Sequence, residues 1–276
     1  MWYNIFKNLE VSMKTKKIIT LALSCLCLTT LLSACASSNT QTTNIPSTAS
    51  SSKKSTMTIG EYLANDKKPI ILFEVKEIDK DTPINSAYVF QNGKVTTYNL
   101  SIPLGDLAKL DTNKIIDLLE DKYYKKIQKG YEREIEIWKN DYAYSKENIQ
   151  EFIGRLEEFK PQLDNFEIKS FPYIINLETD SSGNSTSLEH LKFERIEIKY
   201  DPRIDAEGHM DMGIRTSSNI ITVHSYAGTY SIYDASFAAF HVPDSSFTKF
   251  LITPVKNEIT FELDQPTTKL KSITID

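Results

Sequence analysis

The chain has 276 residues, a formal net charge of −5 at pH 7, and charged side chains at a quarter of its positions. Residues 1–34 hold four of the 32 basic residues and one of the 37 acidic ones, so the remainder has a net charge of −8. An acidic chain lacks the basic surface that nucleic-acid phosphates require, and anionic lipid repels it. We therefore exclude nucleic acid as a partner and expect any membrane attachment to depend on a covalent lipid.

The first predicted element is an apolar segment that follows a cluster of positive charge. Lys14–Lys17 contains three lysines, and residues 18–32 are apolar or small and carry no charge. A helix of this length spans about 22 Å, which is short of the ~30 Å hydrocarbon core of a bilayer. The arrangement is typical of a signal peptide and not of a permanent transmembrane helix.

The apolar segment ends in Leu32-Ser33-Ala34-Cys35. These four residues resemble the lipobox of bacterial lipoproteins, in which the chain is cut before the cysteine and the cysteine is diacylated. The resemblance implies a signal peptide at 1–34 and a lipid anchor at Cys35 on the extracytoplasmic face of the cell membrane. Two acyl chains on one residue give stable attachment. The alternative is a buried apolar helix that holds a buried cysteine.

Residues 1–12 fit a signal peptide poorly because they are hydrophobic where positive charge is expected. Leu9-Glu10-Val11 can be encoded by codons that contain the purine run GGAGG, a ribosome-binding sequence, shortly before Met13. We therefore expect translation to start at Met13. The DNA sequence of these codons decides the point.

The cysteines support an extracytoplasmic location. Cys25 and Cys27 lie in the predicted signal peptide, so only Cys35 remains after cleavage. This excludes a disulfide framework, a CxxC redox pair and a cysteine-ligated zinc site, and we expect no cofactor. Lysine outnumbers arginine by 27 to 5, a bias that together with the lipobox suggests a Gram-positive bacterium with an AT-rich genome.

Residues 35–56 are mostly Ser, Thr, Asn and Gln and contain almost nothing to bury. They predict a lipidated, disordered tether that holds the following domain about 25 Å from the bilayer. The rest of the chain forms either one domain or two, 57–165 and 166–276.

A β-meander is predicted over residues 69–100. Ile71, Phe73 and Val75 alternate with the residues between them, a second strand covers 87–90, and Asn92-Gly93 precedes a third. Asn-Gly between two such runs predicts a tight hairpin turn, because a type I′ turn needs positive φ at both central residues.

The middle of the chain predicts two or three helices. Asp111 or Thr112 caps the first, whose apolar residues recur every three or four positions and which we expect to end at Gly130. Residues 131–142 fit a helix or a strand. Ser145 caps a further amphipathic helix, which we expect Pro161 to end.

From Phe166 onward the apolar residues have a period of two, which predicts several strands of an antiparallel sheet or sandwich. The fold class is therefore α+β, with an N-terminal β-meander, two or three central helices, and a larger C-terminal antiparallel β region.

The chain beyond the lipobox resembles uncharacterised surface lipoproteins of low-GC Gram-positive bacteria. The similar segments are TIGEYL at 58–63, TDSSGNST at 179–186 and YDASFAAF at 233–240. The resemblance implies a cell-surface location and brings no activity. It transfers one functional residue, the lipidated Cys35.

One cluster of potential metal ligands lies between residues 201 and 211. It comprises Asp201, Asp205, Glu207, His209 and Asp211. Oxygen ligands with one imidazole suit a divalent cation, but the spacing matches neither an EF-hand loop nor HExxH. The alternative, which we favour, is a solvated acidic loop between two strands.

A second candidate site is an aromatic strand. In a regular strand His224, Tyr226 and Tyr230 share one face and form a strip on which a wall sugar or a peptide can stack. The alternative, which we also favour, is sheet packing with the tyrosine hydroxyls at its rim.

One motif of nucleophilic catalysis is absent, because the chain has no GxSxG elbow. We therefore expect a membrane-anchored, non-catalytic binding or interaction module whose partner is a protein or a cell-wall component. The alternative is an envelope enzyme or a divalent-cation-dependent ligand-binding protein.

Overall fold

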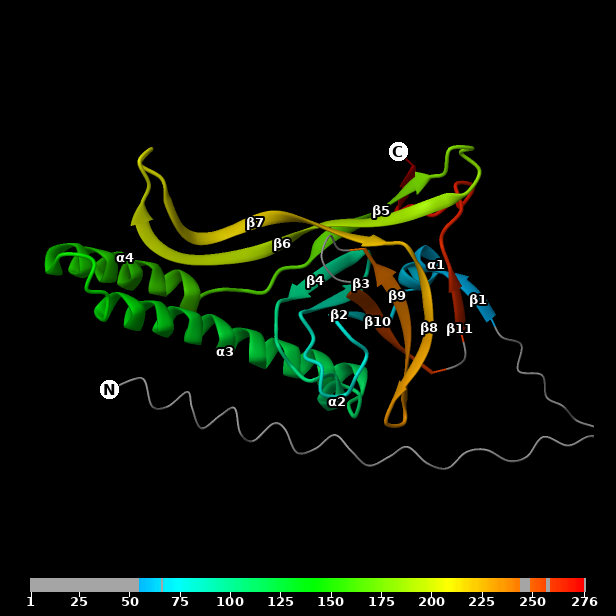
Figure 1. Cartoon of the computed structure of the whole chain (residues 1–276), viewed down its shortest axis with the longest axis horizontal. Coiled ribbons are helices and arrows are strands. Elements are labelled where there is room, and N and C mark those ends of the chain that lie inside the picture. Colours follow the sequence, from blue (N-terminus) through cyan, green and yellow to red (C-terminus); the bar gives the residue numbers. More distant parts are fainter. Residues whose placement is uncertain (1–54, 66, 244–248, 257–258, 276) are drawn as a thin grey trace, which may run out of the picture. The chain divides into compact units, whose positions relative to one another are not determined.

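The computed structural model describes residues 55–65, 67–243, 249–256 and 259–275 (Figure 1). All of them belong to one compact unit, Ser52–Asp276. The predicted signal peptide, the lipobox with Cys35, and most of the predicted tether lie outside the described residues. Ser55 and Thr56, which the sequence places in the tether, are the first two residues of a strand.

The described residues form four helices and twelve strands. The helices are α1 (Ile59–Ala64), α2 (Leu104–Leu107), α3 (Thr112–Lys139) and α4 (Lys146–Asp164). The strands are β1 (Ser55–Thr58), β2 (Ile70–Val75), β3 (Ser86–Gln91), β4 (Lys94–Tyr98), β5 (Phe171–Thr179), β6 (Thr186–Ile204), β7 (Met210–Val223), β8 (Ser225–Ile232), β9 (Ala235–Val242), β10 (Lys249–Val255), β11 (Ile259–Glu262) and β12 (Ile273–Ile275).

A mixed fold with a large antiparallel sheet is confirmed. Nine strands of the main sheet follow the order β7-β6-β5-β4-β3-β2-β10-β9-β8, and β12 joins β5 in parallel. The early strands β2 to β4 thus lie between strands from the second half of the chain. A separate pair, β1 with β11, is parallel. Between β3 and β4, Asn92 (φ 53°) and Gly93 (φ 73°) supply the positive φ values of a two-residue turn.

The two long helices both extend past the residues at which the sequence predicted their ends. α3 runs through Gly130 to Lys139, and α4 continues through Pro161 to Asp164. A Cβ on Gly130 would lie 3.0 Å from the ring of Tyr200, so this glycine allows α3 and β6 to approach closely. Pro161 lies in the last turn of α4, where a missing N–H removes little of the helix. Both predicted ends are therefore wrong.

Alternation along the central strands divides the apolar residues between two cores. Phe73 of β2 faces a core shared with α2, α3 and α4. Leu72 and Tyr88 face a second core, shared with α1 and with inward residues of β5, β6 and β7. The Tyr88 and Phe193 rings meet edge to face across this second core, 5.6 Å apart. Strands β5 to β7 therefore lie over the central strands and enclose an apolar interior between two layers (Figure 1).

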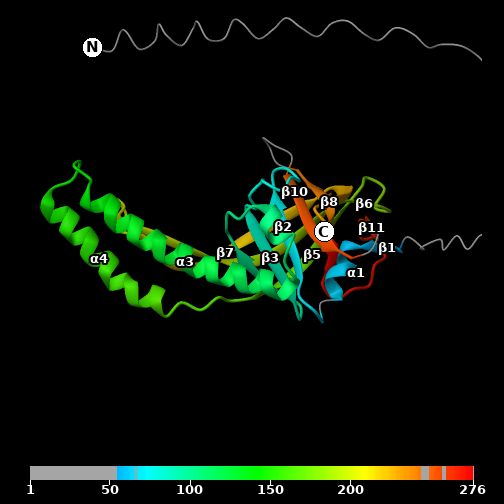
Figure 2. The same ribbon diagram turned by 90° about the horizontal axis from the view of Figure 1, so that it is seen from below.

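The long β6–β7 hairpin continues beyond this interior onto the helices. α3 and α4 lie side by side next to the outer half of the hairpin (Figures 1 and 2). The Tyr200 hydroxyl donates to the Ile127 carbonyl of α3 at 3.0 Å, and Arg155 of α4 donates to the Pro202 carbonyl at 2.7 Å. These contacts fix the outer half of β6 against both helices.

Candidate functional site

The hairpin turn between β6 and β7 contains the central residue of the predicted cation site. The Asp205 carboxylate accepts hydrogen bonds from the backbone N–H groups of Glu207 (3.1 Å) and His209 (2.7 Å), and Gly208 has a φ of 86°. Asp205 therefore forms the turn. The possible ligand atoms of Asp205, Glu207 and His209 lie within 4.8 Å of one another, and all three residues are exposed.

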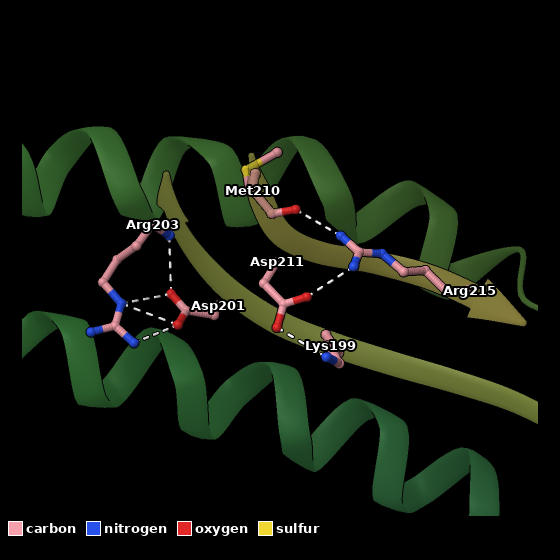
Figure 3. A network of polar contacts seen from close by, with 6 residues as sticks. All are labelled: Lys199, Asp201, Arg203, Met210, Asp211 and Arg215. Carbon is pink, nitrogen blue, oxygen red and sulfur yellow. Dashed lines mark hydrogen bonds and ion pairs between the residues drawn. The ribbon is translucent and has the colours of Figure 1, made fainter. Parts of the chain in front are cut away.

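The other two predicted ligands are bound to basic side chains (Figure 3). Asp201 accepts from the Arg203 Nε at 2.9 Å, and this hydrogen bond holds the pKa of Asp201 below its usual range. Asp211 contacts Lys199 at 3.1 Å and Arg215 at 2.9 Å. The five predicted residues therefore do not converge on one centre. Their arrangement agrees with the solvated turn that the sequence also allowed.

The aromatic strand does not present its three residues on one face. His224 is exposed between β7 and β8, and a bulge between Tyr226 and Gly228 shifts the pairing of β8 with β9 by one residue. Tyr226 consequently packs into the second core, against Phe240, whereas Tyr230 points to the opposite face. The prediction of a shared face is wrong, because one inserted residue reverses the inward and outward positions that follow it.

A buried carboxyl pair lies at one end of the interior between the layers. Glu189 of β6 and Asp264, just after β11, are both completely buried. The Asp264 backbone N–H donates to Glu189 Oε1. The Asp264 carboxylate accepts from the Thr58 hydroxyl and, at 2.6 Å, from the Gly60 N–H. Three segments distant in sequence thus meet at these two acids.

The pair holds one proton at neutral pH. Burial, assisted by the charge of Asp264, raises the pKa of Glu189 to about 8. Burial also raises the pKa of Asp264, although the hydrogen bond from Thr58 opposes this. The Asp264 carboxylate accepts from two donors, whereas Glu189 Oε2 has no hydrogen-bond partner among the described residues. The proton therefore resides on Glu189 and the charge on Asp264.

A polar cavity of about 350 Å³ lies at the other end of the same interior. In its wall, the Glu74 carboxylate accepts from the Tyr88 hydroxyl at 3.0 Å and lies 3.4 Å from the Lys249 ammonium. Arg195 of β6 and Asn219 of β7 also line the cavity. The Nε of Arg195 and the Nδ2 of Asn219 are buried, and neither has a hydrogen-bond partner within the described ranges.

Sequence reasoning missed both polar ends of the interior. Their signal lies in β6, where Glu189, Leu191, Phe193 and Arg195 occupy successive inward positions. Charged residues in the inward phase of an apolar strand mark buried sites. Their partners lie on strands that no local pattern assigns to the same layer.

Comparisons with protein-family models, with curated proteins and with solved structures find no match to this chain. None of the helices among the described residues is long and apolar enough to cross a bilayer.

Proposed function

We propose that this protein is a lipoprotein, held by a diacylated Cys35 on the extracytoplasmic face of a cell membrane, with a folded unit that binds a ligand or partner without catalysing a reaction. The observation that carries the proposal is the sequence of Lys14–Lys17, the uncharged residues 18–32, and Leu32-Ser33-Ala34-Cys35. This order of positive charge, short apolar run and small residues before a cysteine is that of a lipoprotein signal peptide.

The first described residues support an attachment at this end of the folded unit. β1 pairs in parallel with β11, and Thr58 caps α1 in a capping box with Glu61. Thr58 also donates to the buried Asp264. A tether that enters the unit through β1 is thus connected to the buried core within a few residues, as an anchored domain requires.

A binding role agrees with the polar groups of the interior. The cavity at Arg195 offers buried hydrogen-bond donors that the described residues leave without acceptors, as expected for a surface prepared for a ligand. We propose a protein or a cell-wall component as the partner at the cell surface. The net charge of −8 beyond residue 34 argues against nucleic acid.

A second candidate function is cation-dependent binding. One observation favours it, namely that Asp205, Glu207 and His209 can bring their ligand atoms within 4.8 Å of one another. The Asp205 carboxylate already serves the turn, so we place this candidate second.

The lipid anchor is tested by expressing the full chain in a Gram-positive host with a clickable palmitate analogue. We expect the wild type to incorporate the label and to sediment with membranes. Cys35→Ala should lose the label and retain its signal peptide, which a gel resolves as a larger chain. Cys27→Ala is the matched control, because it removes a cysteine that the cleavage discards. A labelled Cys35→Ala chain, or an unlabelled wild type, would contradict the anchor.

A further inference from the structure

The cavity at Arg195 contains more hydrogen-bond donors than the described residues satisfy. The Arg195 Nε and the Asn219 Nδ2 are buried without partners, and Arg195 forms no ion pair within the described ranges. Buried donors are almost always hydrogen-bonded in folded proteins, and an unsatisfied donor on a charged group costs the most free energy. A bound acceptor would satisfy both donors.

The charge of Arg195 is not neutralised by the described groups around it. Its charge acts on the hydroxyls of Tyr88 and Tyr123. Burial raises the pKa of both tyrosines above the usual value, so both are neutral at pH 7. The Glu74 carboxylate is bound to Tyr88 and to Lys249. Arg195 therefore stays uncompensated.

The charge in the cavity wall selects the ligand. Within the described ranges Glu74 pairs with Lys249, and Arg195 is a lining residue whose positive charge has no ion-pair partner. A monoanion balances the charge of Arg195, whereas a dianion such as HPO₄²⁻ places a second negative charge beside Glu74. A guanidinium presents its donors in a planar fork that matches the two oxygens of a carboxylate.

We infer that this cavity binds a small organic carboxylate, whose oxygens accept from Arg195 and Asn219. A volume of about 350 Å³ is near the lower limit for ligand pockets, which fits a molecule of a few carbon atoms. The inference goes beyond the proposed function, because it assigns a small-molecule ligand in addition to a surface partner. It does not depend on the lipid anchor, so the labelling of Cys35 and the experiment below fail independently.

The test is an NMR titration of the unit Ser52–Asp276, which contains both apolar cores and is therefore expected to fold without the preceding residues. The chain has five arginines, so the Nε–H region of a ¹H–¹⁵N spectrum holds at most five signals. Sodium acetate is added against sodium chloride at equal ionic strength. We expect acetate to shift one Nε–H signal saturably, and Arg195→Lys to abolish that signal and its response.

Two variants of β7 separate a ligand contact from a general effect. Asn219→Leu removes a donor in the cavity wall and should weaken acetate binding by about tenfold or more. Ser217→Ala is the control. Ser217 lies opposite Arg195 and has a buried hydroxyl without a partner in the described part of the chain, but it does not line the cavity. We expect Ser217→Ala to bind acetate as the wild type does.

Three results would overturn the inference. The first is no saturable shift of the Arg195 signal up to 0.1 M acetate. The second is an equal response to chloride, which would reduce the effect to ionic strength. The third is tighter binding of inorganic phosphate than of acetate at pH 8, where phosphate is mainly the dianion HPO₄²⁻, because balancing the charge of Arg195 requires a monoanion. Backbone amide spectra that overlay those of the wild type exclude misfolding of each variant.

Discussion

The two ends of the interior between the sheet layers contrast in how they compensate charge. At one end Glu189 and Asp264 are completely buried, and a proton on Glu189 reduces two negative charges to one. At the other end Arg195 lines an open cavity with no carboxylate partner among the described residues. Glu189 and Arg195 are six positions apart on β6 and face the same interior, about 20 Å from each other.

This contrast shows that burial determines how the charge at each end is compensated. A carboxyl group sealed from solvent can take up a proton, because its pKa moves into the range of physiological pH. An arginine cannot lose its proton, so its charge needs an anion or water. The closed end therefore stabilises the fold, whereas the open end is available to a ligand.

The largest expected effect concerns the closed end. The pKa of Glu189 in the folded state, about 8, lies above the unfolded value of 4.5. The contribution of Glu189 to the free energy of unfolding is fully present below pH 4.5 and is lost as the pH rises through about 8. We expect the free energy of unfolding to fall by ~2–4 kcal/mol between pH 5 and pH 8.5 through this group. Urea unfolding at several pH values measures it.

Glu189→Gln should remove this decline, because a glutamine amide is neutral at every pH and its carbonyl oxygen can still accept from the Asp264 N–H. Glu194→Gln is the matched control on the same strand, since Glu194 is exposed and should leave the pH profile of the wild type unchanged. Identical pH profiles for Glu189→Gln and the wild type would show that the closed end does not hold the proton.

A smaller effect concerns the rigidity of β6 beyond Arg195. A Cβ on Gly130 would lie 3.0 Å from the Tyr200 ring, so Gly130→Ala should push α3 away from β6. We expect this substitution to destabilise the protein by ~1–3 kcal/mol. Gly154 of α4 is the control, because nothing lies within 4 Å of its Cβ position. There, alanine should stabilise by ~0.5–1 kcal/mol. Denaturant unfolding of both variants decides whether this contact constrains the strand.

The smallest effect is expected at the hairpin turn, where the charges are exposed and paired with one another. Asp205→Ala should lower the free energy of unfolding by less than ~1 kcal/mol, because water replaces the lost hydrogen bonds to the Glu207 and His209 N–H groups.

Adding 1 mM Ca²⁺ or Zn²⁺ should leave the thermal unfolding midpoint of the wild type unchanged. A rise with either cation that disappears in Asp205→Ala would instead establish a cation site.

Local patterns in the sequence predicted much of the secondary structure. Alternation along residues 71–75 and the helical period after Asp111 both come from side chains close in the chain. The errors at Gly130 and Pro161 have a different origin. Tyr200 packs against Gly130 from 70 residues away, and a proline in a last helical turn removes too little to end it.

The site was harder to predict than the fold, for a physical reason. The five acidic and imidazole residues at 201–211 were visible as a cluster, but the ion pairs of Asp201 with Arg203 and of Asp211 with Arg215 were not. A single bulge at Ala227 reversed the face of Tyr230. The carboxyl pair and the Arg195 cavity combine strands that only the tertiary structure brings together.

The most direct test of this contrast compares the urea stability of wild type and Arg195→Met at pH 7, in acetate and in chloride of equal ionic strength. At an acetate concentration ten times the Kd measured in the titration, the wild type should gain ~1.4 kcal/mol over chloride, and Arg195→Met should gain nothing. Equal gains in both proteins would contradict the account, because acetate would then stabilise the protein without occupying the open end.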